Sequence, residues 1–302
     1  MDWWLELILG ILLVMIGSYL FTEGAEGIGS RFSLSSSFLG SVVSPLFTSM
    51  PEAIVIIVSL YQGARDVGIG TVFGEPFMVS TISYSLVAIP LFLARRASLS
   101  VQRRLIIPYL LVIGAYPFSL LASLGLHWLG ASILLAAYVA FIALMRGNPM
   151  EPGEYGGHAS FLPKLVASLV LIPIGSHVLV NGVESAASVL GLGELALSLV
   201  LVPIATALPE TMSSMIWAYK GQDTLAIGAL IGEQAIFSTL YPALLLLTMG
   251  FNDAAAIEWS VAATVFSSLV MLPLVSRGKI PTPALLVGLA PYVAYLIIML
   301  RL

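Results

Sequence analysis

The chain has 302 residues, of which 59% are hydrophobic and 9% charged, with a mean hydropathy of +1.04 and a formal net charge of −4. Because soluble domains carry about 25% charged residues, this composition excludes a soluble globular protein and indicates an integral membrane protein. The few basic residues lie between apolar runs, which argues against nucleic-acid binding, and the absence of cysteine excludes disulfides and thiolate metal sites.

Apolar runs bounded by glycine, proline or charged residues predict ten membrane-spanning helices, since one crossing takes about 20 apolar residues. The N-terminus has no basic region and no small-residue cleavage site, so we expect the first run to be retained as a span. The spans are expected at roughly 3–24, 36–62, 68–94, 104–122, 126–146, 161–183, 194–219, 223–249, 253–275 and 281–301.

The longest polar stretch runs from Arg146 to His158, between the fifth and sixth expected spans. It divides the chain into a first five-helix unit at 1–146, a linker loop at 147–160 and a second five-helix unit at 161–302. Because five is odd, the second unit crosses the membrane in the opposite sense to the first, as in the inverted repeats of secondary transporters. We therefore predict an all-α membrane protein of ten transmembrane helices in two inverted five-helix repeats.

The basic residues favour one orientation in the membrane. With the N-terminus outside, all of them except Arg65 and Arg301 fall on cytoplasmic loops, in agreement with the positive-inside rule. We expect a multi-pass protein of a prokaryotic cell membrane with both termini outside. The lipid bilayer is its expected surrounding, and no obligatory protein partner is evident.

Two segments of the chain repeat each other without gaps and place acids inside apolar spans. Glu210 follows Glu52, and Glu233 follows Glu75, by the same 158 residues. An ionisable residue at membrane depth costs several kcal/mol, so it is by default a functional residue. Buried neutral acids that bond neighbouring helices are the alternative, but four matched positions make this structural explanation the weaker one.

The second and seventh expected spans each contain two prolines, Pro45 and Pro51 in one and Pro203 and Pro209 in the other. A proline inside a helix removes one N–H donor and leaves a carbonyl without its partner. At membrane depth such breaks persist only where the carbonyls face protein or water. We therefore predict that helices two and seven are broken.

Each broken helix collects oxygen donors on one face. Thr48 and Ser49 lie four and three residues before Glu52, and Thr206 lies four residues before Glu210. Carboxylates, hydroxyls and unpaired carbonyls are the ligands that Ca²⁺ takes, typically six to eight per ion. If the halves pack about a pseudo-twofold axis, all four glutamates converge with these hydroxyls near the midplane of the bilayer.

These motifs resemble the α-repeats of the cation/Ca²⁺ exchanger superfamily, especially prokaryotic Na⁺/Ca²⁺ exchangers, whose first motif reads G-T-S-L-P-E. Here it stands as Phe47-Thr48-Ser49-Met50-Pro51-Glu52 and Ala205-Thr206-Ala207-Leu208-Pro209-Glu210. The resemblance implies a core of spans two, three, seven and eight, across which spans one and six slide. It also implies metal-ligating roles for the acids and hydroxyls, namely Glu52, Glu210, Thr48, Ser49 and Thr206.

The chain departs from the family pattern in the helix that follows each motif. The family reads G-N-x-x-x-S-x-x-x-N/D there. Its asparagine is replaced by Thr71 and Ala229, its serine by Glu75 and Glu233, and its last position by Val79 and Phe237. Two extra carboxylates therefore stand where the family has sodium-ligating serines, which makes Glu75 and Glu233 candidate carriers of a proton or another counter-ion.

The sequence thus predicts a transporter and not an enzyme: a secondary antiporter that exchanges Ca²⁺ or a related divalent cation for H⁺ or Na⁺ by alternating access, without a cofactor. Two other functions stay open. A five-plus-five inverted-repeat transporter of small organic solutes would need an aromatic-lined pocket. An intramembrane carboxylate-dependent hydrolase would need an asymmetric site, usually with a histidine or a nucleophile.

Overall fold

The computed structural model describes residues 2–50, 52–53, 56–57, 65–146, 161–189, 202–248 and 254–299. Within these ranges the side chains of residues 65–68, 70–71, 183–184, 187, 202–210, 254–257, 296 and 298–299 are not described. In this part of the chain, helices lie at all ten predicted positions. Seven stretches are long and apolar enough to cross a membrane, and two shorter apolar stretches cover Ser36–Thr48 and Thr282–Tyr295.

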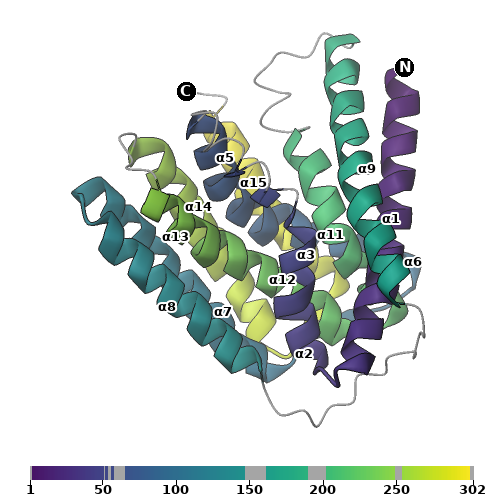
Figure 1. The fold of residues 1–302 in the computed structure, drawn as a ribbon, viewed down its shortest axis with the longest axis horizontal. Coiled ribbons are helices and arrows are strands. Elements are labelled where there is room, and N and C mark those ends of the chain that lie inside the picture. The colour runs from purple at the N-terminus through teal and green to yellow at the C-terminus, as the bar shows by residue number, and fades with distance from the viewer. Residues whose placement is uncertain are drawn as a thin grey trace.

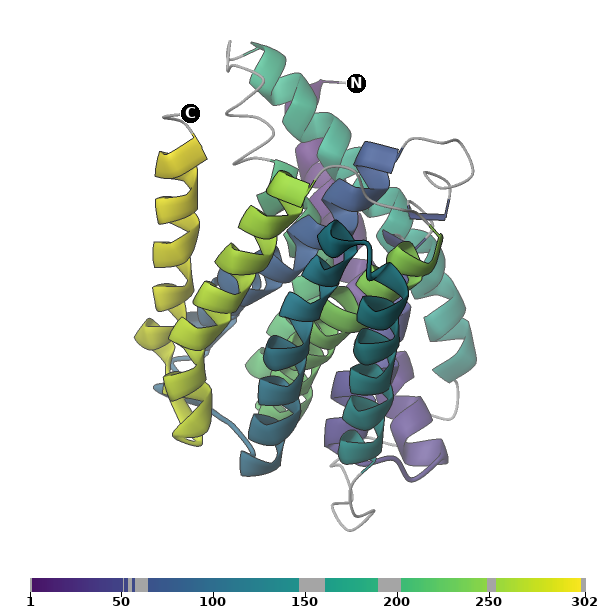
Figure 2. The same cartoon turned by 90° about the vertical axis from the view of Figure 1, so that its left-hand side faces the viewer.

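The first half consists of α1 (Trp3–Arg31), α2 (Ser36–Phe38), the π-helix η1 (Leu39–Val43), α3 (Ser44–Thr48), α5 (Arg65–Met78), the π-helix η2 (Val79–Ser83), α6 (Tyr84–Leu93), β1 (Ser98–Ser100), η3 (Arg103–Leu105), α7 (Ile106–Ala115), η4 (Tyr116–Leu124) and α8 (His127–Met145). The second half consists of α9 (Phe161–Val189), α11 (Val202–Lys220), α12 (Asp223–Ala235), the π-helix η6 (Ile236–Leu240), α13 (Tyr241–Thr248), α14 (Ala254–Ser276), β2 (Lys279–Pro281), η7 (Thr282–Gly288) and α15 (Leu289–Met299). α1 begins and α15 ends at the same end of the bundle (Figures 1 and 2).

The break predicted in the second span is present, because α3 ends at Thr48 and Ser49 is a turn residue. In the seventh span, α11 continues from Val202 through Pro209 to Lys220 as one helix. The earlier part of that predicted span, 194–201, lies outside the described residues.

The third and eighth spans share a distortion next to their acids. Glu75 precedes η2 by four residues, and Glu233 precedes η6 by three. Pro76 lies inside α5 and removes one backbone N–H there, but Gln234 takes its place in α12. Proline is therefore not the common cause of the two π-helices. Such turns inside α-helices occur frequently at functional sites.

Glycines allow the second and eighth spans to touch through their backbones. A Cβ atom on Gly40 would lie 2.8 Å from the carbonyl oxygen of Leu225, and one on Gly228 would lie 3.3 Å from the amide nitrogen of Ser41. A Cβ on Gly232 would overlap the carbonyl oxygen of Ser41. The third and seventh spans meet through a hydrogen bond of 2.7 Å between side chains. Each half of the core thus packs against the other half.

α1 and α9 lie side by side along one flank of the bundle as a long antiparallel pair (Figure 1). Gly10, Gly17 and Gly24 of α1 recur every seven residues, and Cβ atoms there would crowd Leu179, Ile172 and Leu165 of α9, in that order. Gly175 and Gly182 of α9 make the reciprocal approach to α1. Small residues at this spacing let transmembrane helices pack closely, so α1 and α9 form one unit.

A two-stranded antiparallel sheet joins two loops at one end of the bundle. β1 pairs with β2 in the register Leu99↔Ile280. Beside it, Arg96 forms a bidentate ion pair with Asp223 at 2.7 and 2.9 Å, and Asp223 also accepts from the Ser100 amide at 2.8 Å. This short sheet is a small exception to the predicted all-α fold. It places the loops after the third and ninth spans together, as the predicted topology requires.

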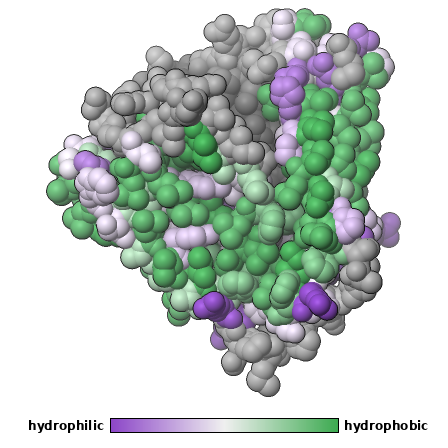
Figure 3. Space-filling view, in the orientation of Figure 1, coloured by the Kyte–Doolittle hydropathy of each residue, from purple (hydrophilic) through white to green (hydrophobic). Residues whose placement is uncertain are grey.

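The outer surface is apolar. In the view of Figure 3, hydrophobic side chains cover the face of the bundle, and hydrophilic ones gather toward its ends. Large hydrophobic residues such as Ile16, Leu129 and Phe266 are half or more exposed. Such a surface is stable only against lipid, so the chain is an integral membrane protein.

The α1–α9 contact yields a test of the fold. A Cβ on Gly10 would lie 2.6 Å from the backbone nitrogen of Leu179, whereas one on Gly114 of α7 has nothing within 4 Å. Overpacking at a backbone contact costs about 1–3 kcal/mol, so Gly10→Leu should lower the apparent melting temperature in detergent by roughly 3–10 °C. Gly114→Leu is the matched control and should leave it unchanged. Equal melting temperatures for the two variants would contradict the close packing of α1 on α9.

Candidate cation site

The second span delivers two hydroxyls to the interior where its helix breaks. Ser49 has φ −87° and ψ 9°, so it closes α3 with a turn, and both Thr48 and Ser49 are buried. Thr48 Oγ1 lies 3.2 Å from the carbonyl oxygen of Ser44, and Ser49 Oγ donates to the carbonyl oxygen of Pro45 at 2.7 Å. The structure thus places both hydroxyls inside the bundle, each within reach of a backbone oxygen.

Glu233 enters the same region from the eighth span and is only 1% exposed. Its Oε1 lies 3.4 Å from Thr48 Oγ1, a long hydrogen bond. Its Oε2 is buried and has no hydrogen-bond partner among the described residues. A carboxylate in such surroundings needs a proton or a cation to compensate its charge. The structure therefore brings a hydroxyl of the first half onto an acid of the second half.

Glu52 and Glu75 lie close to this pair. Both are partly buried, and both are near enough to Glu233 to interact with it electrostatically. Three of the four predicted acids therefore share one region of the core. Within the part of the chain that the structure describes, however, no three acids or histidines are placed tightly enough to hold a metal ion as they stand.

The predicted site residues of the seventh span are described only by their backbone. Thr206 and Glu210 lie on α11, and their side chains are outside the described part. The next residue, Thr211, is fully buried and donates from Oγ1 to Ser83 Oγ of η2 at 2.7 Å. The backbone that carries Glu210 is therefore part of the core, next to the third span.

Tyr241 is a residue near the site that the sequence did not single out. From the start of α13, its hydroxyl donates to the carbonyl oxygen of Ser49 at 3.0 Å and lies 2.9 Å from Ser49 Oγ. It therefore holds the break of the second span against the eighth. The residue 158 positions earlier is Ser83, which contacts Thr211 instead. The difference between tyrosine and serine at these matched repeat positions is the sequence signal that could have indicated Tyr241.

Comparisons with known proteins agree with the division of the chain into two halves. A family model described as sodium/calcium exchanger protein matches residues 3–146 and 162–301, which are the two halves of the chain. The putative antiporter CaxA of Alkalimonas amylolytica is 27% identical over 294 residues and is matched over 90% of each chain. The inner membrane protein YrbG of Escherichia coli K12 is 25% identical over 299 residues, 93% of this chain and 91% of that protein.

Solved structures of the sodium-calcium exchanger NCX_Mj share the fold. The structure soaked with zero Na⁺ and Ca²⁺ has a TM-score of 0.77 at 22% identity, over 96% of both chains. The structure soaked with 10 mM Na⁺ and 10 mM Sr²⁺ has a TM-score of 0.75 at 23% identity. The likeness confirms the ten-helix inverted-repeat fold. Since the family model covers both halves, the chain belongs to the sodium/calcium exchanger family.

Proposed function

We propose that this protein is a secondary active antiporter that exchanges Ca²⁺, or a related divalent cation, for H⁺ by alternating access. The observation that carries the proposal is the buried Glu233, which contacts Thr48 across the interface of the two repeats and interacts with Glu52 and Glu75. Oxygen donors of this kind suit a hard divalent cation. The proposed exchange uses no cofactor.

The proposed divalent ligands are the acids and hydroxyls that the repeats match, namely Glu52, Glu75, Glu210, Glu233, Thr48, Ser49 and Thr206. Glu52 and Glu210 supply the principal charge for the divalent ion. We propose that small shifts of the helices bring these ligands close enough to bind the ion and move them apart again to release it. The proposed orientation has both termini outside a prokaryotic cell membrane, which agrees with the common end at which α1 begins and α15 ends.

The proposal of proton coupling follows from the excess of negative charge. One divalent cation neutralises only two of four carboxylates, and like charges at this depth repel strongly because the surroundings have a low dielectric constant. Protons and the divalent ion then compete for the same oxygens, and each binds when the other leaves. Glu75 and Glu233 are the proposed proton carriers, with Na⁺ as the alternative counter-ion.

Loss of one principal carboxylate tests the ligand roles. Glu52→Gln or Glu210→Gln should reduce Ca²⁺ uptake into proteoliposomes by about 100-fold or more, because a dehydrated divalent ion loses one of its main charge partners. Glu258→Gln, at an exposed acid of α14, is the matched control and should transport normally. Monodisperse elution in detergent separates lost transport from lost folding. Normal uptake by either ligand variant would place the site elsewhere.

The counter-ion is tested by the gradient that drives uptake. A pH gradient that is acidic inside the proteoliposomes should drive Ca²⁺ accumulation at constant Na⁺, because protons leave as Ca²⁺ enters. Glu75→Gln or Glu233→Gln should reduce this proton-driven uptake. A Na⁺ gradient at fixed pH should have little effect. Uptake that follows Na⁺ and ignores pH would assign Na⁺ as the counter-ion and leave cation exchange intact. A panel of divalent ions and organic solutes in the same assay separates the other functions that the sequence left open.

A double-mutant cycle separates a ligand role of Ser49 from a positioning role. Ser49→Ala removes the contact of 2.9 Å between these side chains, and Tyr241→Phe removes both this contact and the hydrogen bond to the Ser49 carbonyl oxygen. Each should raise the Ca²⁺ concentration for half-maximal uptake by roughly twofold to tenfold. The double variant should transport no worse than Tyr241→Phe alone, because Tyr241→Phe already removes the contact between the two side chains. If the two effects on the half-maximal Ca²⁺ concentration add up, and the effect of Ser49→Ala is much the larger, Ser49 binds the ion without help from Tyr241. Ser132→Ala, at an exposed hydroxyl of α8 that donates to the carbonyl oxygen of Trp128, is the control and should transport normally.

A further inference from the structure

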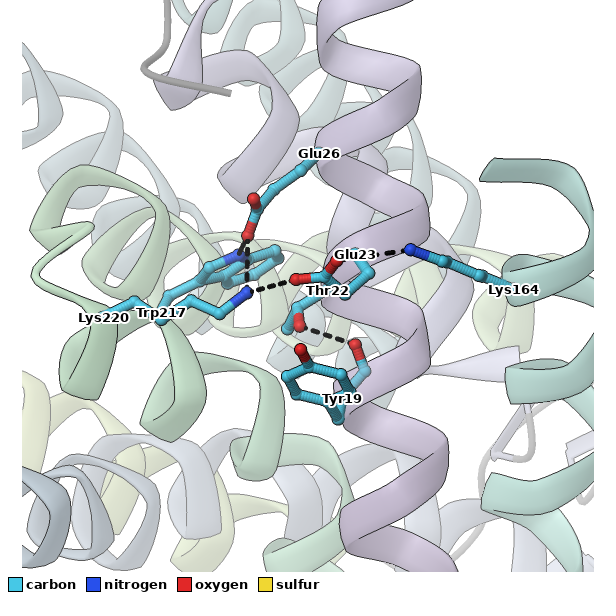
Figure 4. Close-up of polar contacts among 7 residues, drawn as sticks. All are labelled: Tyr19, Thr22, Glu23, Glu26, Lys164, Trp217 and Lys220. Carbon is cyan, nitrogen blue, oxygen red and sulfur yellow. Dashed lines mark hydrogen bonds and ion pairs between the residues drawn. The ribbon is translucent and has the colours of Figure 1, made fainter. Parts of the chain in front are cut away.

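A second set of charged side chains lies outside the cation site, where α1, α9 and α11 meet (Figure 4). Glu23 of α1 accepts from Lys164 of α9 at 3.3 Å with one oxygen and from Lys220 of α11 at 2.8 Å with the other. Lys220 also pairs with Glu26 at 3.2 Å. Four charges from three helices thus form one connected cluster.

The acids of the cluster are buried, whereas its two lysine side chains are each 26% exposed. Glu23 and Glu26 are 8% and 4% exposed. The indole Nε1 of the fully buried Trp217 donates to Glu26 Oε1 at 3.2 Å, and the ammonium of Lys220 lies 5.3 Å from the centre of the Tyr19 ring. Removing a lysine would leave the charge of a buried acid uncompensated, so these contacts favour the arrangement in which the three helices meet.

The contacts of the cluster differ in which helices they join. Lys164 binds Glu23 within the α1–α9 unit, whose glycine contacts run along its whole length. Lys220 and Trp217 bind the same acids from α11, the helix that carries Glu210. Among the contacts of the cluster described here, those of Lys220 and Trp217 thus cross from the α1–α9 unit to the core.

The Glu23–Lys220 pair of the cluster is not repeated in the sequence of the other half. The other two charged positions are matched by acids, Glu26 by Glu184 and Lys164 by Glu6. The residue 158 positions after Glu23 is Asn181, and the residue 158 positions before Lys220 is Gln62. The charged pair at one end thus corresponds to two uncharged amides at the other. Two identical inverted repeats would give the two access states equal energies, so this replacement favours the state in which the charged end is closed.

Two buried hydroxyls belong to helices that the cluster joins. Ser18 of α1 and Ser214 of α11 are fully buried, and their oxygens have no hydrogen-bond partner among the described residues. Ser214 lies four residues after Glu210 and three before Trp217, so the three positions share one face of α11. Unpartnered hydroxyls are costly in a closed interface and gain water when it opens.

We infer that Lys220 is a positioning residue for alternating access: through Glu23 and Glu26 it holds the α1–α9 unit against α11 and closes the passage between the cation site and this end of the bundle. The ion pairs break when the site opens to this end, which is the cytoplasmic one in the proposed orientation. The inference rests on the proposed function, and it assigns to these residues the choice of the side from which the site is reached.

Because the chain has no cysteine, a single introduced thiol reports access without background. Ser214→Cys serves as the reporter, and a membrane-impermeant maleimide is applied to each side of oriented vesicles. Lys220→Met should raise the labelling rate from the side at which α1 ends and not from the other side. The increase should be at least about fivefold, the lower end of the range for coupling between two sites of a protein. Lys220→Arg keeps the charge and should label within about twofold of the parent.

Lys164→Met is the matched control, because it removes an ion pair of Glu23 that stays within the α1–α9 unit, and it should label as the parent does. Glu23→Gln carries the same expectation as Lys220→Met and replaces it if that variant fails to fold. An unchanged rate in the folded variants, an equal increase with Lys164→Met, or an increase from both sides would overturn the inference. Labelling needs no transported ion, so absence of cation flux with these labelling results would refute the proposed antiport alone.

Discussion

The backbone contact between the second and eighth spans is the feature on which the site depends. Gly40, Gly228 and Gly232 leave no room for side chains between η1 and α12. Glu233 follows Gly232 directly, so the contact that brings the backbones together also sets this carboxylate beside Thr48. A larger residue at position 232 would separate the helices and the two members of the site at once. Close packing here serves the placement of charge as much as stability.

The two halves use the same plan but differ at positions that matter for function. Both place a π-helix after the acid of the core helix, at η2 and η6. Ser49 of the first repeat meets Tyr241, whereas its counterpart Ala207 has no hydroxyl to offer. Symmetry supplies two states of similar energy, and these differences decide how unequal the states are. A transporter with inverted repeats needs both properties, since a site that opens to one side only cannot exchange ions.

The fold could be predicted because two strong signals agree: apolar runs of membrane length, and a gapless repeat that carries prolines and acids. The meeting of Thr48 with Glu233 followed from the assumption of a pseudo-twofold axis. Contacts that break the repeat could not be predicted this way. Lys220 was expected on a loop, because a lysine at the end of an apolar run normally reaches water.

The lengths of the first and sixth spans show the same limit. α1 extends to Arg31 and α9 to Val189, beyond the predicted ends near 24 and 183. Hydropathy ends a span where acids appear, but Glu23 and Glu26 are compensated by Lys164 and Lys220 and stay buried. Only the position of a partner distant in sequence reveals that compensation.

The surroundings of the break suggest how the proposed exchange avoids leakage. A cavity of about 140 Å³ lies between α1, α3 and α9, and its lining is mainly apolar, with Phe21, Phe47 and Met50 among its residues. Phe47 of α3 directly precedes Thr48, and Phe21 of α1 lines the same cavity. Movement of the α1–α9 unit along α3 therefore carries apolar side chains such as Phe21 past the region of the acids. Such a movement is costly while carboxylates are uncompensated, because apolar groups displace the water that solvates them.

In the proposed exchange a bound divalent ion or bound protons remove that cost, so the loaded site would move and the empty one would not. The charged cluster acts on the same helix, since Lys220 lies ten residues after Glu210 on α11, a distance of about 15 Å along the helix axis. Any shift of α11 relative to α1 that tightens ligands around an ion therefore also changes the geometry of the Lys220 ion pairs. One helix joins the charge balance of the site to the closure of one end of the bundle.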